Sequence, residues 1–148
     1  MGKAKDLDAK ELAKQIGERF PGSVEDASGN SLVVKGESLY QVAQYLKETP
    51  KLEFEFLNCL VGTDYMDYFE VVYILESFKH NHRLCLKARA YGRQNPTLPS
   101  VNGLWRGADF QEREVYDLLG VIFTGHPNLK RIALWEGFEG HPLRRDYL

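Results

Sequence analysis

Cysteine, long apolar runs and an excess of either charge are all scarce in this sequence of 148 residues. The two cysteines, Cys59 and Cys85, lie in separate apolar segments, and neither belongs to a Cys-x-x-Cys pair of the kind that binds zinc or an iron–sulfur cluster. They are predicted to be reduced core thiols. The sequence has no run of about eighteen apolar residues and no apolar stretch near its start, so we expect neither a membrane span nor an export signal.

The charge balance argues against nucleic acid as a partner. Nineteen basic residues stand against twenty-one acidic residues, which gives a formal net charge of -2 and no general attraction for DNA, RNA or anionic lipid. Hydrophobic residues make up 43% of the chain, enough for one domain of this length to bury a core without disulfides or a structural metal.

Two amphipathic helices are predicted in the first third of the chain. Apolar residues recur at every fourth position up to Phe20, which predicts a helix that begins at Asp6 or Asp8, where an aspartate can cap free amide groups. After Gly36, apolar residues again share one helical face, and Ser38 is the expected N-cap of this second helix.

Strands are predicted around and after these helices. A polar turn at residues 28–30 separates two short strand-like stretches and predicts a hairpin. Residues 54–64, 68–78 and 83–91 are rich in branched and aromatic side chains and predict an antiparallel meander covered by the two helices. In the third of these runs, alternate residues should face the core, namely Leu84, Leu86, Ala88 and Ala90.

A third helix is predicted from about residue 108 to 119, with Gly120 as its C-cap. The spacing of Arg113 with Asp109 and with Asp117 predicts ion pairs between successive helical turns. Taken alone, the pattern of this helix is typical of one whose charged face is exposed to solvent. No nucleophile motif or phosphate-binding loop accompanies its carboxylates, so the pattern does not suggest catalysis.

Residues 121–148 show no sustained helical or strand period, yet they are too apolar for a solvated tail. We therefore expect this segment to be buried largely against another polypeptide. It contains Gly-His-Pro twice, and we interpret both copies as turns. A metal site at His126 and His141 is the alternative, although no cysteine or carboxylate stands at ligand spacing from either.

The predicted fold class is α+β, a two-layer arrangement of helices packed on a mostly antiparallel sheet, with an extended C-terminal tail. Its parts are an α+β domain at 1–98, a helical segment at 99–120 and the C-terminal segment at 121–148, all in one structural unit.

The sequence then offers a family resemblance. The run "PSVNGLWRGADFQEREVYDLLGVIFTGHPNLKRI", followed by "GHPLRRDY", resembles the C subunit, or 30-kDa subunit, of complex I, the NADH:quinone oxidoreductase. The Glu-Arg-Glu motif at 112–114 and the first Gly-His-Pro at 125–127 carry the signature, and the central strands are similar from about residue 38 onward. Phe110 stands where the family usually has tryptophan, and Ala133 where a larger aliphatic residue is common.

The resemblance implies a structural role in the peripheral arm of a proton-pumping complex. It implies a chain without cofactors that wraps the D subunit near the quinone site, with the B and I subunits as further neighbours. This chain would be associated with quinone only through the complex, and its contact with the membrane would be indirect. Flavin and iron–sulfur clusters would belong to other subunits, so this chain would be a non-catalytic subunit of the enzyme. The expected location is the cytoplasmic side of a plasma or thylakoid membrane.

The residues expected at the partner interface come from the helix at 108–119 and the C-terminal segment. They are Glu112, Arg113, Glu114, Asp117, His126, Arg131, Trp135, His141, Arg144, Arg145, Asp146 and Tyr147. Two alternatives stay open: the equivalent subunit of a hydrogenase, F420H2-dependent or ferredoxin-dependent complex, and a free-standing enzyme or metal-binding protein.

Overall fold

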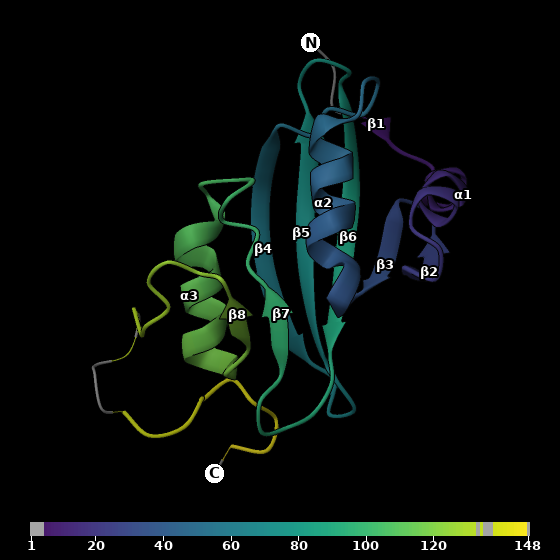
Figure 1. The fold of residues 1–148 in the computed structure, drawn as a ribbon. Helices are drawn as coiled ribbons and strands as arrows, with labels where there is room; N and C mark the ends of the chain where they lie inside the picture. The colour runs from purple at the N-terminus through teal and green to yellow at the C-terminus, as the bar shows by residue number, and fades with distance from the viewer. Residues whose placement is uncertain (1–4, 133, 135–137, 148) are drawn as a thin grey trace.

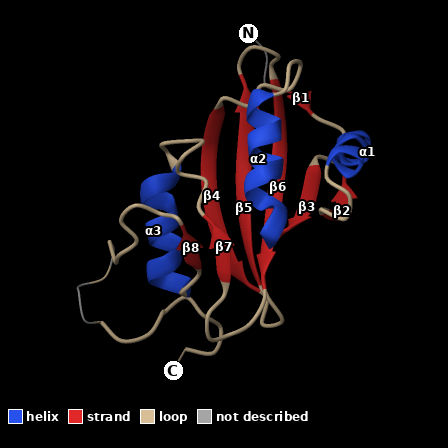
Figure 2. Cartoon of the chain, viewed as in Figure 1, coloured by secondary structure: helices blue, strands red, loops and turns tan. Residues whose placement is uncertain are grey.

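The computed structural model describes residues 5–132, 134 and 138–147. It has helices packed on a mixed, mostly antiparallel sheet, so the predicted α+β class is confirmed (Figures 1 and 2). The elements in chain order are β1 (Lys5–Asp6), α1 (Ala9–Arg19), β2 (Val24–Ser28), β3 (Ser31–Lys35), a short 3-10 turn (Gly36–Ser38), α2 (Leu39–Glu48), β4 (Phe56–Asp64), β5 (Phe69–Ser77), β6 (His82–Ala90), β7 (Thr97–Pro99), α3 (Ala108–Leu119) and β8 (Ile122–Thr124).

The main sheet has the strand order β2-β3-β6-β5-β4. The β2–β3 hairpin and the β4–β5–β6 meander are antiparallel, as predicted. β3 instead pairs in parallel with β6, and the short β1 also runs parallel to β6. α2 lies in the connection that leaves β3 and returns to the sheet at β4, and it lies across β5 and β6 in Figure 1.

The two N-terminal helices begin close to the predicted positions. Asp8 is the N-cap of α1, and its Oδ1 accepts a hydrogen bond from the backbone N–H of Lys10 at 3.0 Å. Ser38 occupies the N-cap position of α2, but its side chain makes no capping bond. The 3-10 turn before α2 already gives Ser38 a helical backbone, whereas a capping residue needs an extended one.

One core lies between the helices and the sheet. In β6, His82 and the four residues predicted to face the core are buried, and the residues between them are half-buried. The alternation also places Cys59 and Cys85 on the opposite face, where Ile74 lies between them in register. Both thiols are free and half-buried, so the prediction that they are core residues is wrong.

α3 packs against the edge strand β4 because a glycine allows close approach. A Cβ atom at Gly62 would lie 2.8 Å from Leu119 Cδ1 and 2.9 Å from Val115 Cγ1, closer than packed carbon atoms come. Gln111 Oε1 accepts the outward N–H of Leu60 at 2.7 Å, which satisfies a backbone group of the sheet edge. The predicted helix and its left-handed C-cap at Gly120, with φ of 81°, are confirmed.

The segment after α3 is less irregular at its start than expected. Residues Ile122–Thr124 form β8, which pairs in parallel with β7 in a small second sheet. Phe123 of β8 and Leu98 of β7 are fully buried and join this small sheet to the main core. Across the part of the chain that the structure describes, no helix has the length and apolar character needed to cross a bilayer.

Candidate partner interface

One carboxylate on α3 binds the middle of the C-terminal segment. The side chain of Asp117 is fully buried and accepts a hydrogen bond from Arg131 Nη1 at 2.6 Å. Its second oxygen accepts the backbone N–H groups of Ile132 at 3.2 Å and Leu134 at 2.8 Å. Arg131 Nη2 also donates to the carbonyl oxygen of Gly140 at 2.6 Å. A buried charge with these partners is compensated, so Asp117 holds Arg131, Ile132 and Leu134 on α3, and Arg131 in turn binds Gly140.

The second Gly-His-Pro copy caps the C-terminal end of α3. The last carbonyl groups of a helix lack partners within the helix, and three of them accept hydrogen bonds from this copy and the residues after it. The pairs are His141 Nδ1 to the oxygen of Asp117 at 2.8 Å, Leu143 N to that of Leu118 at 3.0 Å, and Arg144 Nε to that of Leu119 at 2.5 Å. Burial lowers the pKa of His141, which favours the neutral ring with its proton on Nδ1.

The first Gly-His-Pro copy contacts the other end of α3. His126 Nε2 lies 3.1 Å from the carbonyl oxygen of Asp109 and 3.0 Å from its carboxylate. His126 Nδ1 accepts the backbone N–H of Asn128 at 3.0 Å, so Nε2 carries the proton of the neutral ring and donates toward Asp109. The interpretation of both copies as turns is confirmed, since Gly125 and Gly140 have φ of 82° and 84°.

Both histidines are thus engaged in hydrogen bonds that position the backbone. Each interacts with a different end of α3. In the described ranges, no three His, Cys, Asp or Glu side chains come together as a group that could hold a metal ion.

Arg113 does not form the ion pairs that its spacing predicted. It donates instead to the carbonyl oxygens of Lys130 at 3.3 Å and Arg131 at 3.4 Å. Asp117 pairs with Arg131, and Asp109 faces the first Gly-His-Pro turn. The prediction of pairs within α3 is wrong because the C-terminal segment lies along the helix and supplies nearer partners.

The end of the C-terminal segment is held by a second cluster, which we call the Asp64 cluster. Arg93 binds the Asp64 carboxylate through two nitrogens, at 2.7 and 2.8 Å, and lies over the Phe69 ring at 4.6 Å. Asp64 also accepts the backbone N–H of Arg145 at 2.8 Å. The second guanidinium nitrogen of Arg93 lies 3.0 Å from Asp146. The hydrogen bonds from Arg93 lower the pKa of Asp64, against the opposing effect of burial.

Glu112 is a third buried acid, and it joins α3 to the turn that precedes it. Its side chain is fully buried and accepts hydrogen bonds from Ser100 Oγ at 2.6 Å and from the N–H of Val101 at 2.9 Å. Burial raises the pKa of Glu112, although these two hydrogen bonds oppose the shift. Burial, followed by the charge of Glu112, raises the pKa of Tyr73. The expectation of a solvated charged face on α3 is therefore wrong for Glu112 and Asp117.

Comparison with known proteins identifies the family. A family model described as "Respiratory-chain NADH dehydrogenase, 30 Kd subunit" matches residues 32–148. The chain belongs to this family. The C subunit of NADH-quinone oxidoreductase from Roseiflexus sp. (strain RS-1) is 48% identical over 128 residues, covering 84% of this chain and 73% of the relative. The C subunit from Herpetosiphon aurantiacus is 40% identical over 146 residues, covering 95% of this chain and 85% of the relative.

A solved structure shares the fold of this member of the 30-kDa subunit family. A chain of the membrane-bound sulfane sulfur reductase, an archaeal respiratory membrane complex, superposes with a TM-score of 0.73 at 23% identity. The match covers 93% of this chain and 84% of the other.

The residues expected at the partner interface of this family member differ in their exposure to solvent. Glu112 and Asp117 are buried, and Trp135 lies outside the described residues. The exposed ones are Glu114, Arg145, Asp146 and Tyr147, and the half-buried ones are Arg113, His126, Arg131, His141 and Arg144. Sequence reasoning missed Asp64 and Arg93. The sequence holds no signal for this pair beyond the opposite charges of the two residues, because Asp64 ends β4 and Arg93 lies in the loop after β6.

Acid should loosen the end of the C-terminal segment through Asp64. Because its pKa in the folded chain lies below the ordinary value of 3.8, its stabilising contribution is fully present above pH 3.8 and is lost as the pH falls through the folded value. Asp64→Asn should lower the free energy of unfolding by about 2 kcal/mol at neutral pH, a value reduced for the partial exposure of Arg93. The variant should also lose less stability than the parent chain as the pH falls below 3.8. Thermal unfolding between pH 7 and 2 measures both effects, and an equal loss of stability in acid for the variant and the parent chain would contradict the assignment.

Gly120→Ala should destabilise the chain more than Gly125→Ala, although both glycines have nearly the same positive φ. At Gly125 an added Cβ meets nothing within 4 Å, so that variant should cost about 1 kcal/mol for the left-handed backbone alone. At Gly120 the Cβ would lie 2.6 Å from Arg144 Nη2 and 2.7 Å from His141 Cδ2, so the cost should rise to about 2–3 kcal/mol. Equal melting temperatures for the two variants would show that the segment does not pack on Gly120.

Proposed function

We propose that this chain is a cofactor-free structural subunit of the peripheral arm of a proton-pumping NADH:quinone oxidoreductase. In this role it supports the quinone-reducing module by wrapping the D subunit, with the B and I subunits as further neighbours. It would be held on the cytoplasmic side of the membrane by these partners. The activity of the complex would use catalytic groups on other subunits.

The observation that carries this proposal is the contrast between the motif residues, which make internal hydrogen bonds, and the nearby large apolar side chains, which stay exposed. Asp117, His126 and His141 make hydrogen bonds that position the C-terminal segment on α3. Large apolar side chains of α3 and the C-terminal segment stay in contact with water. They are Phe110 at 60% exposure, Leu143 at 60%, Tyr147 at 42% and Ile132 at 37%. Polar groups turned inward and apolar groups turned outward favour a surface that binds protein.

The cysteine inventory supports placing electron carriers elsewhere. Iron–sulfur clusters are commonly held by four thiolates, and the sequence has only Cys59 and Cys85. We therefore assign the iron–sulfur clusters of the complex to other subunits, and we place the flavin there as well because the family resemblance implies it.

The test is assembly of the whole complex around an affinity-tagged form of this chain. The double variant Arg113→Ala, Arg144→Ala removes two guanidinium groups that position the C-terminal segment, and we expect its co-purification with D, B and I subunits to fall at least tenfold. The matched control is Lys10→Ala, Lys14→Ala, which removes two exposed positive charges from α1 and should change nothing. Normal assembly of the Arg113 and Arg144 variant would count against the proposed wrapping of the D subunit.

A related complex is the second candidate. The archaeal chain of the same fold belongs to a membrane-bound sulfane sulfur reductase, so the fold alone leaves open the equivalent subunit of a ferredoxin- or F420H2-dependent dehydrogenase or of a membrane-bound hydrogenase. Mass spectrometry of the purified complex discriminates the two candidates, since NADH-oxidising subunits co-purify only in the first case. Elemental analysis and substrate turnover of the isolated chain test the remaining alternative, a free-standing metalloprotein or enzyme.

A further inference from the structure

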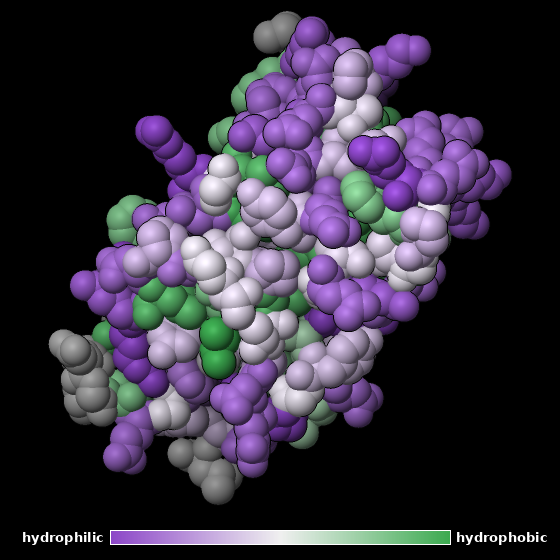
Figure 3. Space-filling model, in the orientation of Figure 1, coloured by the Kyte–Doolittle hydropathy of each residue, from purple (hydrophilic) through white to green (hydrophobic). Residues whose placement is uncertain are grey.

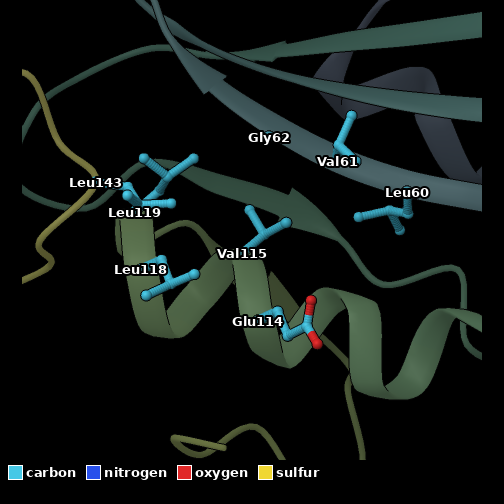
Figure 4. Close-up of a pocket in the computed structure, with 8 residues that line it drawn as sticks. All are labelled: Leu60, Val61, Gly62, Glu114, Val115, Leu118, Leu119 and Leu143. Carbon is cyan, nitrogen blue, oxygen red and sulfur yellow. The ribbon is translucent and has the colours of Figure 1, made fainter. Parts of the chain in front are cut away.

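A shallow groove of about 200 Å³ lies where the edge strand β4, helix α3 and the C-terminal segment meet (Figure 4). We call it the β4–α3 groove. Its lining is apolar apart from one carboxylate and consists of Leu60, Val61, Gly62, Glu114, Val115, Leu118, Leu119 and Leu143.

Three separate parts of the chain build this groove. Gly62 lets α3 approach β4, and the hydrogen bond from Leu143 N to the oxygen of Leu118 places the C-terminal segment at the end of the helix. Figure 4 shows Leu143 beside Leu119, with Val115 between the helix and the strand. The C-terminal segment therefore completes one side of the groove when it is folded onto α3.

Apolar side chains at the edges of the groove are exposed to solvent. Val61 is 49% exposed and Leu143 is 60% exposed. The face seen in Figure 3 is mostly hydrophilic over α1 and α2, while hydrophobic residues reach the surface toward α3. Burying such side chains against a partner removes apolar surface from water and stabilises the complex.

One charge borders the groove without a partner of its own. Glu114 is exposed, and across residues 5–132, 134 and 138–147 no cation or hydrogen-bond donor is paired with its carboxylate. It is also the only charged residue among those lining the groove. A carboxylate at the rim of an apolar contact is complementary to a lysine or arginine on the partner.

Size argues against a small molecule as the occupant. Pockets for drug-sized ligands usually measure about 300–1,000 Å³ and bring several polar groups together. The β4–α3 groove is smaller, more open and offers a single polar side chain. It suits one or two large aliphatic or aromatic side chains of a protein.

We propose that the β4–α3 groove binds a segment of another subunit that inserts a large apolar side chain between β4 and α3 and places a lysine or arginine against Glu114. This inference rests on the proposed function, because the occupant is a subunit of the same complex. It adds the place of contact and the chemistry of the segment that fits it.

Photo-crosslinking in the assembled complex tests the place of contact. p-Benzoylphenylalanine at position 61 or at position 143 should cross-link to one other subunit, at a peptide that carries a large apolar residue next to, or one helical turn from, a lysine or arginine. The same group at position 44, exposed on α2, serves as the control and should not reach that peptide. Cross-links to a second copy of this chain, or none from 61 and 143 in a complex that still co-purifies, would overturn the groove and leave the proposed function standing. Failure of the unmodified chain to co-purify with any subunit would overturn both.

Two substitutions test the chemistry. Leu143→Asp should lower retention of the chain in the complex at least tenfold, and Glu114→Lys should lower it several-fold at low salt and less at high salt, because rim charges are screened. Glu48→Lys makes the same charge change on the exposed surface of α2 and is the matched control. The isolated variants should melt within about 2 °C of the parent chain, so that lost retention reports binding. Retention equal to the parent for both Leu143→Asp and Glu114→Lys would refute the proposed contact.

Discussion

Replacing Asp117 with alanine should release Arg131, Ile132 and Leu134 from α3 while the sheet stays folded. The variant leaves the guanidinium of Arg131 and the N–H groups of Ile132 and Leu134 without the buried carboxylate that binds them. Removing one partner of a buried pair costs about 3–5 kcal/mol, so hydrogen exchange at residues 132 and 134 should accelerate about 100-fold or more. Amides in β5 and β6 should keep their protection.

The control for this experiment lies on the same helix. Glu114 is exposed and has no pairing partner in the described part of the chain, so Glu114→Ala should change stability by less than about 0.5 kcal/mol. Asp117→Asn should fall between the two, because an amide keeps one acceptor but loses the charge that binds Arg131. Unchanged exchange at 132 and 134 in Asp117→Ala would show that the segment is held by other contacts.

Regular elements could be predicted from the sequence because their signals are local. The apolar spacing that placed α1, α2 and α3, and the alternation that placed β6, each reflect the geometry of a single element. Gly120 was recognised as a C-cap for the same reason, since its left-handed backbone ends the helix next to it.

The buried acids could not be predicted, because their environment comes from distant segments. Glu112 and Asp117 share a charged helix with exposed Glu114, and the helix pattern alone does not separate them. Glu112 is covered by the turn at Ser100, and Asp117 by the chain from Arg131 onward. The Asp64–Arg93 pair joins the last residue of β4 to a residue in the loop after β6, 29 positions along the chain, and no periodic pattern relates the two.

The C-terminal segment differs from the expectation in an informative way. We expected residues 121–148 to depend on another polypeptide, yet the described residues bind their own chain at Asp117, at the end of α3 and at Asp64. These contacts are mainly polar, while Leu143 and Tyr147 stay exposed. A segment already ordered before a partner arrives loses less conformational entropy on binding, which favours tight association.

Glu112→Ala should be among the most destabilising single substitutions in α3. It leaves the N–H of Val101 unsatisfied and opens a cavity in the core, at a cost of about 3–4 kcal/mol, or a fall of about 8–12 °C in melting temperature for a chain of this size. Calorimetry on the isolated chain measures this loss. Glu112→Gln should cost less than about 1 kcal/mol, because the amide oxygen can accept from Val101 and the amide nitrogen can donate to the hydroxyl of Ser100.

The pH dependence distinguishes a buried acid from a polar residue that only fills space. The pKa of Glu112 is raised in the folded chain, so between the ordinary value of 4.5 and that higher value the folded state binds more protons than the unfolded state. Its contribution is complete below pH 4.5 and is lost as the pH rises through the folded pKa. Glu112→Gln imitates the protonated acid, so its stability should not decline over this pH range. At pH values above the folded pKa of Glu112, the variant should be as stable as the parent chain or more stable. Parallel stability curves for the two proteins from pH 4 to 8 would show instead that Glu112 stays ionised in the core, with its carboxylate stabilised by the hydrogen bonds from Ser100 and Val101.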